Sequence, residues 1–273
     1  MSILHRNSWY VMDESITGLS ENPMHSFAMD DTLCRLVSAE ADWGIARTWV
    51  HDRTIVLGIQ DSRLPYIDKG IDFLRTEGFD VIVRNSGGLA VVLDEGVLNV
   101  SLIFKDEKRL SIDSGYEAMV EFVRYWFRGC GLEIVDGEIA ESYCPGRYDL
   151  SVGGQKFAGI SQRRLRGGVA VQIYLAVTGS GSERADLVRR FYEVSAGGEE
   201  SKFTYPRIVP ERMASLEELT GERLNVDGLL HSMLLTLKEY SDELGNLSLG
   251  MEQWDVYEEN LARMVKRNEK LMK

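Results

Sequence analysis

Residues 84–91, with the sequence Arg-Asn-Ser-Gly-Gly-Leu-Ala-Val, follow one strand-like run, residues 79–83, and lead straight into another. Gly87 and Gly88 allow a backbone to approach a ligand closely, or to present N–H groups to a carbonyl or an anion. Arg84 suits a carboxylate or a phosphate. Taken alone, the segment fits a plain hairpin turn equally well. No Gly-Lys-Ser/Thr follows it and no G-x-G-x-x-G opens a helix, which excludes a Walker loop and a dinucleotide fingerprint.

A second informative feature is Gly153-Gly154, which separates two strand-like runs. Two glycines between strands predict a hairpin turn, because the favoured turns need positive φ. We expect Leu150 to pair with Phe157 on the buried face of this hairpin. Lys156 then lies with Asp149 on the other face. A lysine there can hold a carbonyl or carry a proton, although an exposed strand lysine explains the same pattern.

The third feature is Cys144, which lies in a loop because Pro145-Gly146 follows it directly. Loops carry reactive groups more often than cores do, and the nearby Arg147 favours a thiolate. A small packing residue is the alternative interpretation. Cys34, in an apolar helical stripe, and Cys130, at a glycine-rich helix end, are both expected to be packing residues. The spacing gives no C-x-x-C metal or redox motif.

Strands and helices intermingle over the first two hundred residues without a strict βαβ rhythm, which predicts an α+β fold rather than a doubly wound sheet. From about Pro210 onward, apolar residues recur at helical spacing. We therefore expect a mixed domain over residues 1–205 and a helical C-terminal extension over residues 206–273. The last stretch, from Trp254, mixes charges of both signs and is expected to be a solvated helix.

The composition excludes several classes of function. The 273 residues include 31 Lys plus Arg against 43 Asp plus Glu, for a formal net charge of -12. Coating nucleic acid or an anionic membrane needs the opposite charge. We see no apolar segment of membrane-spanning length and no signal-peptide pattern, and we expect a reduced, cytoplasmic protein. The four histidines suggest no metal site. Arg163, Arg164 and Arg166 form a local basic cluster suited to an acidic partner or to solvent.

In this order, the segments resemble the catalytic domain family of lipoate-protein ligases, biotin ligases and octanoyltransferases. The quoted parts are residues 56–60, 84–91, 99–101 and 154–162. Either the Arg-x-Ser-Gly-Gly-x-Ala-Val segment or the Lys-x-x-Gly segment alone would be weak, but the two at this separation are specific. Within the family, the loop at residues 141–151 is similar to the cysteine loop of the lipoyl-relay amidotransferases.

The resemblance implies an α+β fold of the biotin/lipoate protein ligase type over the mixed domain, with an acyl pocket walled by the glycine segment. It also implies two catalytic residues, Cys144 and Lys156, and a set of substrate-binding residues: Arg84, Ser86, Gly87, Gly88, Asp149 and Gly159. Leu89 stands where ligases often have a third glycine, and Leu93 where the family often has His. These departures favour transfer through Cys144 over an ATP-dependent ligase.

The implied reaction is acyl exchange in two steps through a Cys144 thioester. The donor would be the glycine cleavage H protein that carries an octanoyl or a lipoyl group. The acceptor would be a lysine on the lipoyl domain of a 2-oxoacid dehydrogenase E2 subunit. One amide replaces another, so neither ATP nor another cofactor is required. Three alternatives stay open: an ATP-dependent lipoate or octanoate ligase, a transferase that uses acyl carrier protein as donor, and a non-catalytic binding module.

The positions of the two catalytic candidates pose a geometric problem. Cys144 lies seven residues before Ser151, the predicted neighbour of Lys156. A straight strand would separate them by about 23 Å. The loop at Pro145-Gly146 must therefore fold back, either in the free protein or only with substrate bound.

Overall fold

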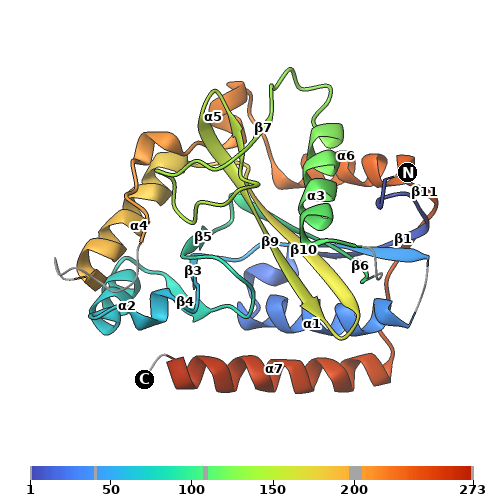
Figure 1. Ribbon diagram of the computed structural model, residues 1–273, viewed down its shortest axis with the longest axis horizontal. Helices are drawn as coiled ribbons and strands as arrows, with labels where there is room; N and C mark the ends of the chain where they lie inside the picture. The colour runs from blue at the N-terminus through green and yellow to red at the C-terminus, as the bar shows by residue number, and fades with distance from the viewer. Residues whose placement is uncertain (1, 40–41, 107–109, 197–204, 272–273) are drawn as a thin grey trace.

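The computed structural model describes residues 2–39, 42–106, 110–196 and 205–271, and Figure 1 shows their arrangement. The expected α+β class is confirmed, because the strands pair both parallel and antiparallel and the helices pack on both faces of the main sheet. The helices are α1 (Met24–Ser38), α2 (Ile67–Thr76), α3 (Ile112–Trp126), α4 (Gly181–Ala196), α5 (Leu216–Thr220), α6 (Val226–Glu239) and α7 (Met251–Leu271). Short 3₁₀ turns occur at Thr17–Leu19, Asp61–Arg63 and Pro210–Arg212.

The large sheet has the strand order β11-β1-β2-β6-β10-β9-β8-β7. Its members are β1 (Arg6–Glu14), β2 (Trp43–Trp49), β6 (Val97–Lys105), β7 (Val135–Asp136), β8 (Leu150–Val152), β9 (Gln155–Leu165), β10 (Gly168–Ala176) and β11 (Ser241–Asn246). Every residue of β10 is buried. In its sequence, large apolar residues alternate with smaller or polar ones, a pattern typical of a half-buried strand. Both faces of the sheet are nevertheless covered here.

A small second sheet carries the glycine segment. Its order is β4-β3-β5, with β3 (Thr54–Leu57), β4 (Asp80–Val83) and β5 (Val91–Leu93). β4 runs parallel to β3 and β5 runs antiparallel to it. Residues 84–90 therefore connect the ends of two strands that both flank β3, which fixes the position of this connection.

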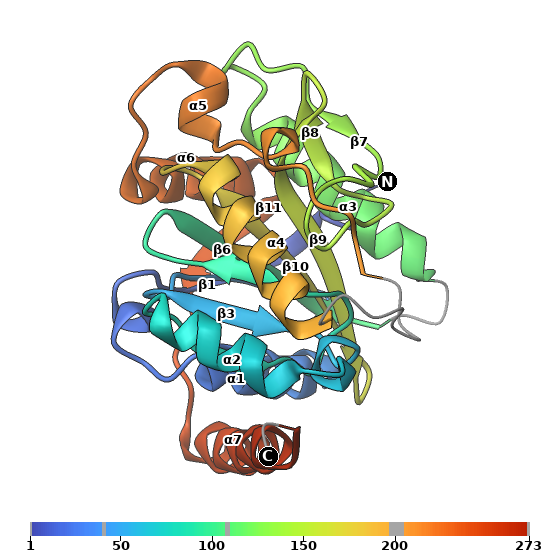
Figure 2. The same cartoon turned by 90° about the vertical axis from the view of Figure 1, so that its left-hand side faces the viewer.

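Two apolar clusters cover the two faces of the large sheet. One cluster joins α1, α2 and α4 to the small sheet, and the other joins α3 and α6 to the opposite face. Figure 1 shows α1 below the large sheet and α3 and α6 above it, and Figure 2 shows α2 and α4 beside the small sheet. The cavity described below lies on the α1 side.

The segment after residue 205 differs from the helical extension expected from the sequence. It contains helices α5, α6 and α7, but it also supplies strand β11, which pairs in parallel with β1 at the edge of the large sheet. Backbone N–H groups of this segment reach the first part of the chain, from Val209 to the carbonyl of Glu141 and from Ala214 to that of Lys156. The domain boundary at residue 205 stays a prediction.

Helix α7 is not solvated on all sides, contrary to the sequence-based expectation. Its side chains at Tyr257, Asn260, Met264 and Asn268 are buried, and the helix packs against α1. A spacing of three or four residues places these side chains on one helix face. In the part of the chain that the structure describes, no helix is both long enough and apolar enough to cross a membrane.

Candidate active site

A cavity of about 200 Å³ lies between the large sheet and the small sheet. From the large sheet it is lined by Trp49, Asn99, Gly159, Ser161, Gln172 and Tyr174, which belong to four neighbouring strands. Val56, Val91 and Leu93 line it from the small sheet. Phe27, Ile160 and Ile173 add to the apolar lining, so the walls are mainly apolar with a few polar groups. Such a lining is typical of a site for an acyl or other small apolar group.

Five of the predicted substrate-binding residues line this cavity together with Cys144. They are Arg84, Gly87, Gly88, Asp149 and Gly159. Ser86 instead lines a neighbouring groove of about 250 Å³ that shares both glycines with the cavity. Two larger and more open grooves, of about 750 and 730 Å³, contain none of the predicted site residues.

The thiol of Cys144 faces two hydrogen-bond donors from the glycine segment. The backbone N–H of Leu89 points to Sγ at 3.1 Å, and a guanidinium nitrogen of Arg84 lies at 3.4 Å. Both donors stabilise negative charge on the sulfur. Cys144 also has a φ of 45°, a left-handed conformation that a residue with a side chain rarely adopts. Such strain persists only where the surroundings hold it, and it is common at functional sites.

Gly88 is required by the close packing around this thiol. It has a φ of 108°. A Cβ atom at this position would overlap the guanidinium of Arg84 and would lie 3.0 Å from Sγ of Cys144. Gly87 differs, because no atom lies within 4 Å of the place that its Cβ would take. Of the two glycines, only Gly88 is fixed by sterics.

Lys156 lies directly behind the cysteine loop and is fully buried. Its Nζ donates to the carbonyl oxygens of Cys144 at 2.9 Å and Tyr143 at 3.0 Å, and it lies 3.0 Å from Oδ2 of Asp149 and 3.3 Å from Oγ of Ser142. Burial raises the pKa of the Asp149 carboxyl, against the opposing effect of the Lys156 charge. The interpretation of Lys156 as an exposed strand lysine is therefore excluded.

The hairpin brings these groups together much as the sequence predicts, with one shift in register. Ser151 pairs with Lys156 across Gly153-Gly154, as expected. Leu150 pairs with Ala158 rather than Phe157, because a bulge interrupts the ladder between Leu150 and Ser151. The bulge adds one residue to one strand, so Leu150 and Phe157 are still both buried in the same cluster.

The contact between Lys156 and Cys144 resolves the distance problem. The chain turns back after Cys144, where the N–H of Gly146 donates to the Asp149 carboxylate at 2.9 Å. The same carboxylate binds Lys156. Asp149 therefore closes the cysteine loop onto the lysine, and the chain folds back as the distance argument requires.

A buried polar group also supports the other side of the glycine segment. Asp61 accepts hydrogen bonds from the N–H of Gly58 at 2.7 Å and the hydroxyl of Tyr192 at 2.8 Å. The same hydroxyl accepts from the N–H of Ala90 at 3.3 Å. Burial raises the pKa of Asp61 to about 6, despite these hydrogen bonds. The sequence analysis did not identify Asp61 or Tyr192.

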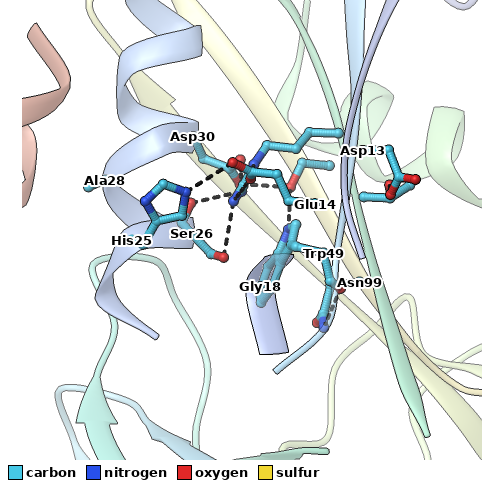
Figure 3. A network of polar contacts seen from close by, with 12 residues as sticks. Asp13, Glu14, Gly18, His25, Ser26, Ala28, Asp30, Trp49 and Asn99 are labelled. Carbon is cyan, nitrogen blue, oxygen red and sulfur yellow. Dashed lines mark hydrogen bonds and ion pairs between the residues drawn. The ribbon is translucent and has the colours of Figure 1, made fainter. Parts of the chain in front are cut away.

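A second polar network lies beneath the cavity and centres on Arg47, which is fully buried. Its guanidinium binds Glu14 at 2.5 Å and Asp30 at 2.9 Å. Figure 3 labels Glu14, Asp30 and His25 of this network, and a ring nitrogen of His25 lies 3.0 Å from the Glu14 carboxylate. Asp30 also accepts from the amide of Gln172 at 2.6 Å, and Gln172 lines the cavity. Gln172, a polar residue of the cavity wall, is thus held in place by the buried ion pair of Asp30 with Arg47.

Several cavity residues were missed by sequence analysis, among them Phe27, Trp49, Asn99, Tyr116 and Gln172. One signal was available for two of them. Asn99 and Gln172 are polar side chains with apolar neighbours in buried stretches of β6 and β10, and a buried polar group needs a specific partner or ligand. Phe27 and Trp49 are indistinguishable from ordinary core aromatics by sequence.

The basic cluster does not present three available charges. Arg163 binds Asp31 through two nitrogens, at 2.8 and 3.1 Å, and Arg164 binds Asp106 at 2.6 Å. Arg166 is exposed. The suggestion that this cluster as a whole docks an acidic partner therefore loses its main support.

The other cysteines behave differently from each other. Cys34 is buried, as expected, but Cys130 is exposed and does not fill a core position. Among the described residues, no group of three or more His, Cys, Asp or Glu side chains is arranged to hold a metal ion.

Comparison with known proteins identifies the family. The chain is 53% identical to an octanoyl-[GcvH]:protein N-octanoyltransferase of Geobacillus kaustophilus, over 99% of this chain and 96% of the relative. It is 56% identical to the protein of the same name from Bacillus velezensis, with the same coverage.

Solved structures share the fold at much lower identity. A lipoate-protein ligase A bound with ATP aligns with a TM-score of 0.73 and 18% identity, over 98% of each chain. A bi-partite lipoate protein ligase from Thermoplasma acidophilum aligns with a TM-score of 0.69 and 17% identity, over 95% of this chain and 93% of that chain. Residues 22–238 match the lipoyl protein ligase A/B catalytic domain, and the chain belongs to that family.

Proposed function

We propose that this protein is an octanoyltransferase that moves an octanoyl group from the glycine cleavage H protein to a lysine of another protein, through a thioester on Cys144. The relatives that bear this activity in their names are about half identical to this chain over nearly its whole length. The observation that carries the proposal is the position of the Cys144 thiol, which lines a largely apolar cavity and faces the N–H of Leu89 and the guanidinium of Arg84.

The first step forms the thioester. Sγ of Cys144 attacks the carbonyl carbon of the octanoyl amide on the donor lysine, and the C–N bond breaks. The thiol proton goes to the departing lysine amine. In the second step the amine of the acceptor lysine attacks the thioester carbonyl, the C–S bond breaks and the sulfur regains a proton. Each step exchanges one acyl bond for another, so the reaction needs no ATP.

The apolar walls suit an eight-carbon chain, because burying each methylene group contributes about 0.8 kcal/mol. Val56, Val91 and Leu93 offer that surface from the small sheet. Binding energy gained along the chain can then position the carbonyl next to Sγ. This supports the assignment of the cavity to the acyl group.

Lys156 contributes to this chemistry through the backbone. Its Nζ has four close contacts, all within residues 142–149, and one of them is the backbone carbonyl of Cys144. It is absent from the residues that line the cavity. We therefore assign to it the positioning of the cysteine loop, and its direct contact with the acyl carbonyl remains a prediction from the family resemblance.

The acceptor that we propose is the lysine of a lipoyl domain on the E2 subunit of a 2-oxoacid dehydrogenase. The name of the relatives states only that the acceptor is a protein. The chemistry requires Cys144 to stay a thiol, which fits a reducing compartment such as the cytoplasm. No further cofactor is proposed.

Intact-mass spectrometry tests the proposal. Wild type incubated with octanoylated H protein should gain one octanoyl group, and the adduct should disappear when a lipoyl domain is added. Cys144→Ala should show neither adduct nor transfer. Pyrophosphate release with activity that survives in Cys144→Ala would indicate an ATP-dependent ligase instead. An adduct formed only from octanoyl-acyl carrier protein would reassign the donor, and no adduct from either donor would indicate a binding module.

A further inference from the structure

The C-terminal helix α7 is tied to the glycine segment through one buried side chain, Asn268. Its amide oxygen accepts a hydrogen bond from the N–H of Val83 at 2.7 Å, and its amide nitrogen donates to the carbonyl of Val83 at 3.2 Å. The same nitrogen donates to the carbonyl of Met264 at 3.0 Å, within α7. Asn268 is 8% exposed. Two of the three hydrogen bonds of this side chain therefore join α7 to Val83 of another element.

Val83 is the last residue of β4, which is the edge strand of the small sheet. The N–H of the following residue, Arg84, faces inward and donates to the carbonyl of Leu57 on β3 at 3.0 Å. Successive residues of a strand direct their backbone groups to opposite edges, so those of Val83 face outward. Asn268 pairs with these outward groups, which would otherwise lack a protein partner.

The contact between Asn268 and Val83 lies one residue from a group that faces the Cys144 thiol. Arg84 directly follows Val83, and one of its guanidinium nitrogens donates to the carbonyl of Leu89 at 2.6 Å and approaches Sγ of Cys144 at 3.4 Å. The N–H of the same Leu89 contacts Sγ. A shift of the chain at Val83 therefore moves both donors that face the sulfur.

Helix α1 provides a second anchor beside the first. The amide of Asn85 donates to Asp31 on α1 at 3.0 Å. About two turns earlier on α7, Asn260 donates to Thr32 of α1 at 2.9 Å, a contact that involves neither β4 nor the glycine segment. Figures 1 and 2 both show α7 lying along α1, on the side away from the large sheet. Asn268 of α7 and Asp31 of α1 therefore each bind one residue of the 83–85 segment directly.

We propose that Asn268 is a positioning residue for acyl transfer, and that α7 is thereby part of the active-site scaffold. The inference rests on the proposed role of Cys144 in thioester formation. It gives the C-terminal helix a function in the chemistry, although its residues line no part of the cavity.

The test compares Asn268→Leu with Asn260→Leu. Both residues are buried amides on α7, but Asn260 bonds to α1 and not to β4. In single-turnover acylation by octanoylated H protein, the amplitude reports the folded fraction and the rate constant reports the geometry at Cys144. We expect Asn268→Leu to lower the rate constant at saturating donor about ten- to hundredfold, with half-saturation unchanged. Asn260→Leu should lower the melting temperature but keep the wild-type rate constant.

Asn268→Asp keeps an acceptor for the N–H of Val83 and loses the donor to its carbonyl. Its rate constant should lie between those of wild type and Asn268→Leu. If Asn268→Leu fails to fold, the comparison with Asn260→Leu uses Asn268→Asp in its place. Equal rate constants for the Asn268 and Asn260 variants, after correction for amplitude, would overturn the proposal.

An independent measurement needs no donor protein. Iodoacetamide alkylation of Cys144, followed by mass spectrometry of the peptide that contains it, should be slower in Asn268→Leu and Asn268→Asp, because the sulfur loses the alignment of Leu89 and Arg84. It should be unchanged in Asn260→Leu. An unchanged or faster reaction in the Asn268 variants would refute the positioning role, even if the donor assignment also failed.

Discussion

The ammonium group of Lys156 donates a hydrogen bond to the backbone carbonyl of Cys144 at 2.9 Å. The same group lies 3.0 Å from the carboxylate of Asp149, and both side chains are almost fully buried. A buried ion pair is fully compensated only while both partners are present. The cysteine loop is therefore held by charge as well as by packing. Its geometry depends on both Lys156 and Asp149.

Replacing the lysine tests this dependence. Lys156→Met leaves the Asp149 carboxylate buried without a cation, so the free energy of unfolding should fall by about 3–5 kcal/mol. Acyl-enzyme formation should be lost, because the carbonyls of Tyr143 and Cys144 also lose their donor. Urea unfolding and intact-mass acylation measure the two effects.

The double variant Lys156→Met/Asp149→Leu is the control. It removes both charges, so it should regain much of the stability but none of the activity. Full stability together with wild-type acylation in Lys156→Met alone would contradict both the structural and the functional part of this interpretation.

The two glycines of the segment offer a matched pair. Gly88→Ala should abolish thioester formation, because the new methyl group overlaps Arg84 and contacts Sγ of Cys144. Its positive φ adds backbone strain. Gly87→Ala meets open space and should retain most of the acylation rate. The acylation rates of the two purified variants test this difference. Similar rates would show that the close packing at Gly88 does not affect thioester formation.

Local sequence patterns predicted the parts of the site that depend on short-range geometry. The Gly153-Gly154 turn fixes the pairing of Ser151 with Lys156 within a few residues. The bulge next to Leu150 was not predicted, because an extra residue in one strand leaves the apolar pattern almost unchanged. The glycine segment could be singled out because its residue types limit what the backbone can do, and several of its residues line the cavity.

Long-range partners could not be predicted in the same way. Asn268 lies 185 residues from Val83 in the chain, and an asparagine in a charged helix looks like a solvated residue. Strand β11 was missed because Ser241–Asn246 lacks β-branched and aromatic residues, and its pairing with β1 is a tertiary effect. The ion pairs of Arg163 and Arg164 were not predicted, because their acidic partners, Asp31 and Asp106, come from distant segments.

Stability in acid should depend on Glu14. Burial alone raises the pKa of this carboxyl, but Arg47 and His25 outweigh that effect and lower it from 4.5 to about 2. A folded-state pKa below the unfolded value stabilises the protein above pH 4.5, and this contribution disappears as the pH falls toward 2. The shift corresponds to about 3 kcal/mol at neutral pH.

Urea unfolding of wild type and Glu14→Gln from pH 7 to pH 3 measures this contribution. The difference in unfolding free energy should be largest at neutral pH and should shrink as the pH falls below 4.5. Glu21→Gln, at an exposed position, should match wild type throughout. A difference for Glu14→Gln that stays constant with pH would show that the ionised carboxylate is not the stabilising species.

Variants of two arginines in the basic cluster can distinguish a structural role of the cluster from a role in partner docking. Arg163 binds Asp31, which also accepts from Asn85 of the glycine segment, whereas Arg166 is exposed. Arg163→Glu should lower the free energy of unfolding by about 1–3 kcal/mol, because it replaces a charge-assisted pair by two like charges. It should also slow acylation, because a displaced Asp31 no longer holds Asn85 of the glycine segment. Arg166→Glu should change neither quantity. Thermal unfolding and the half-saturating concentration of the acceptor lipoyl domain distinguish the two roles. If both variants melt like wild type and need more acceptor, the cluster docks the partner and the ion pair with Asp31 is of minor importance.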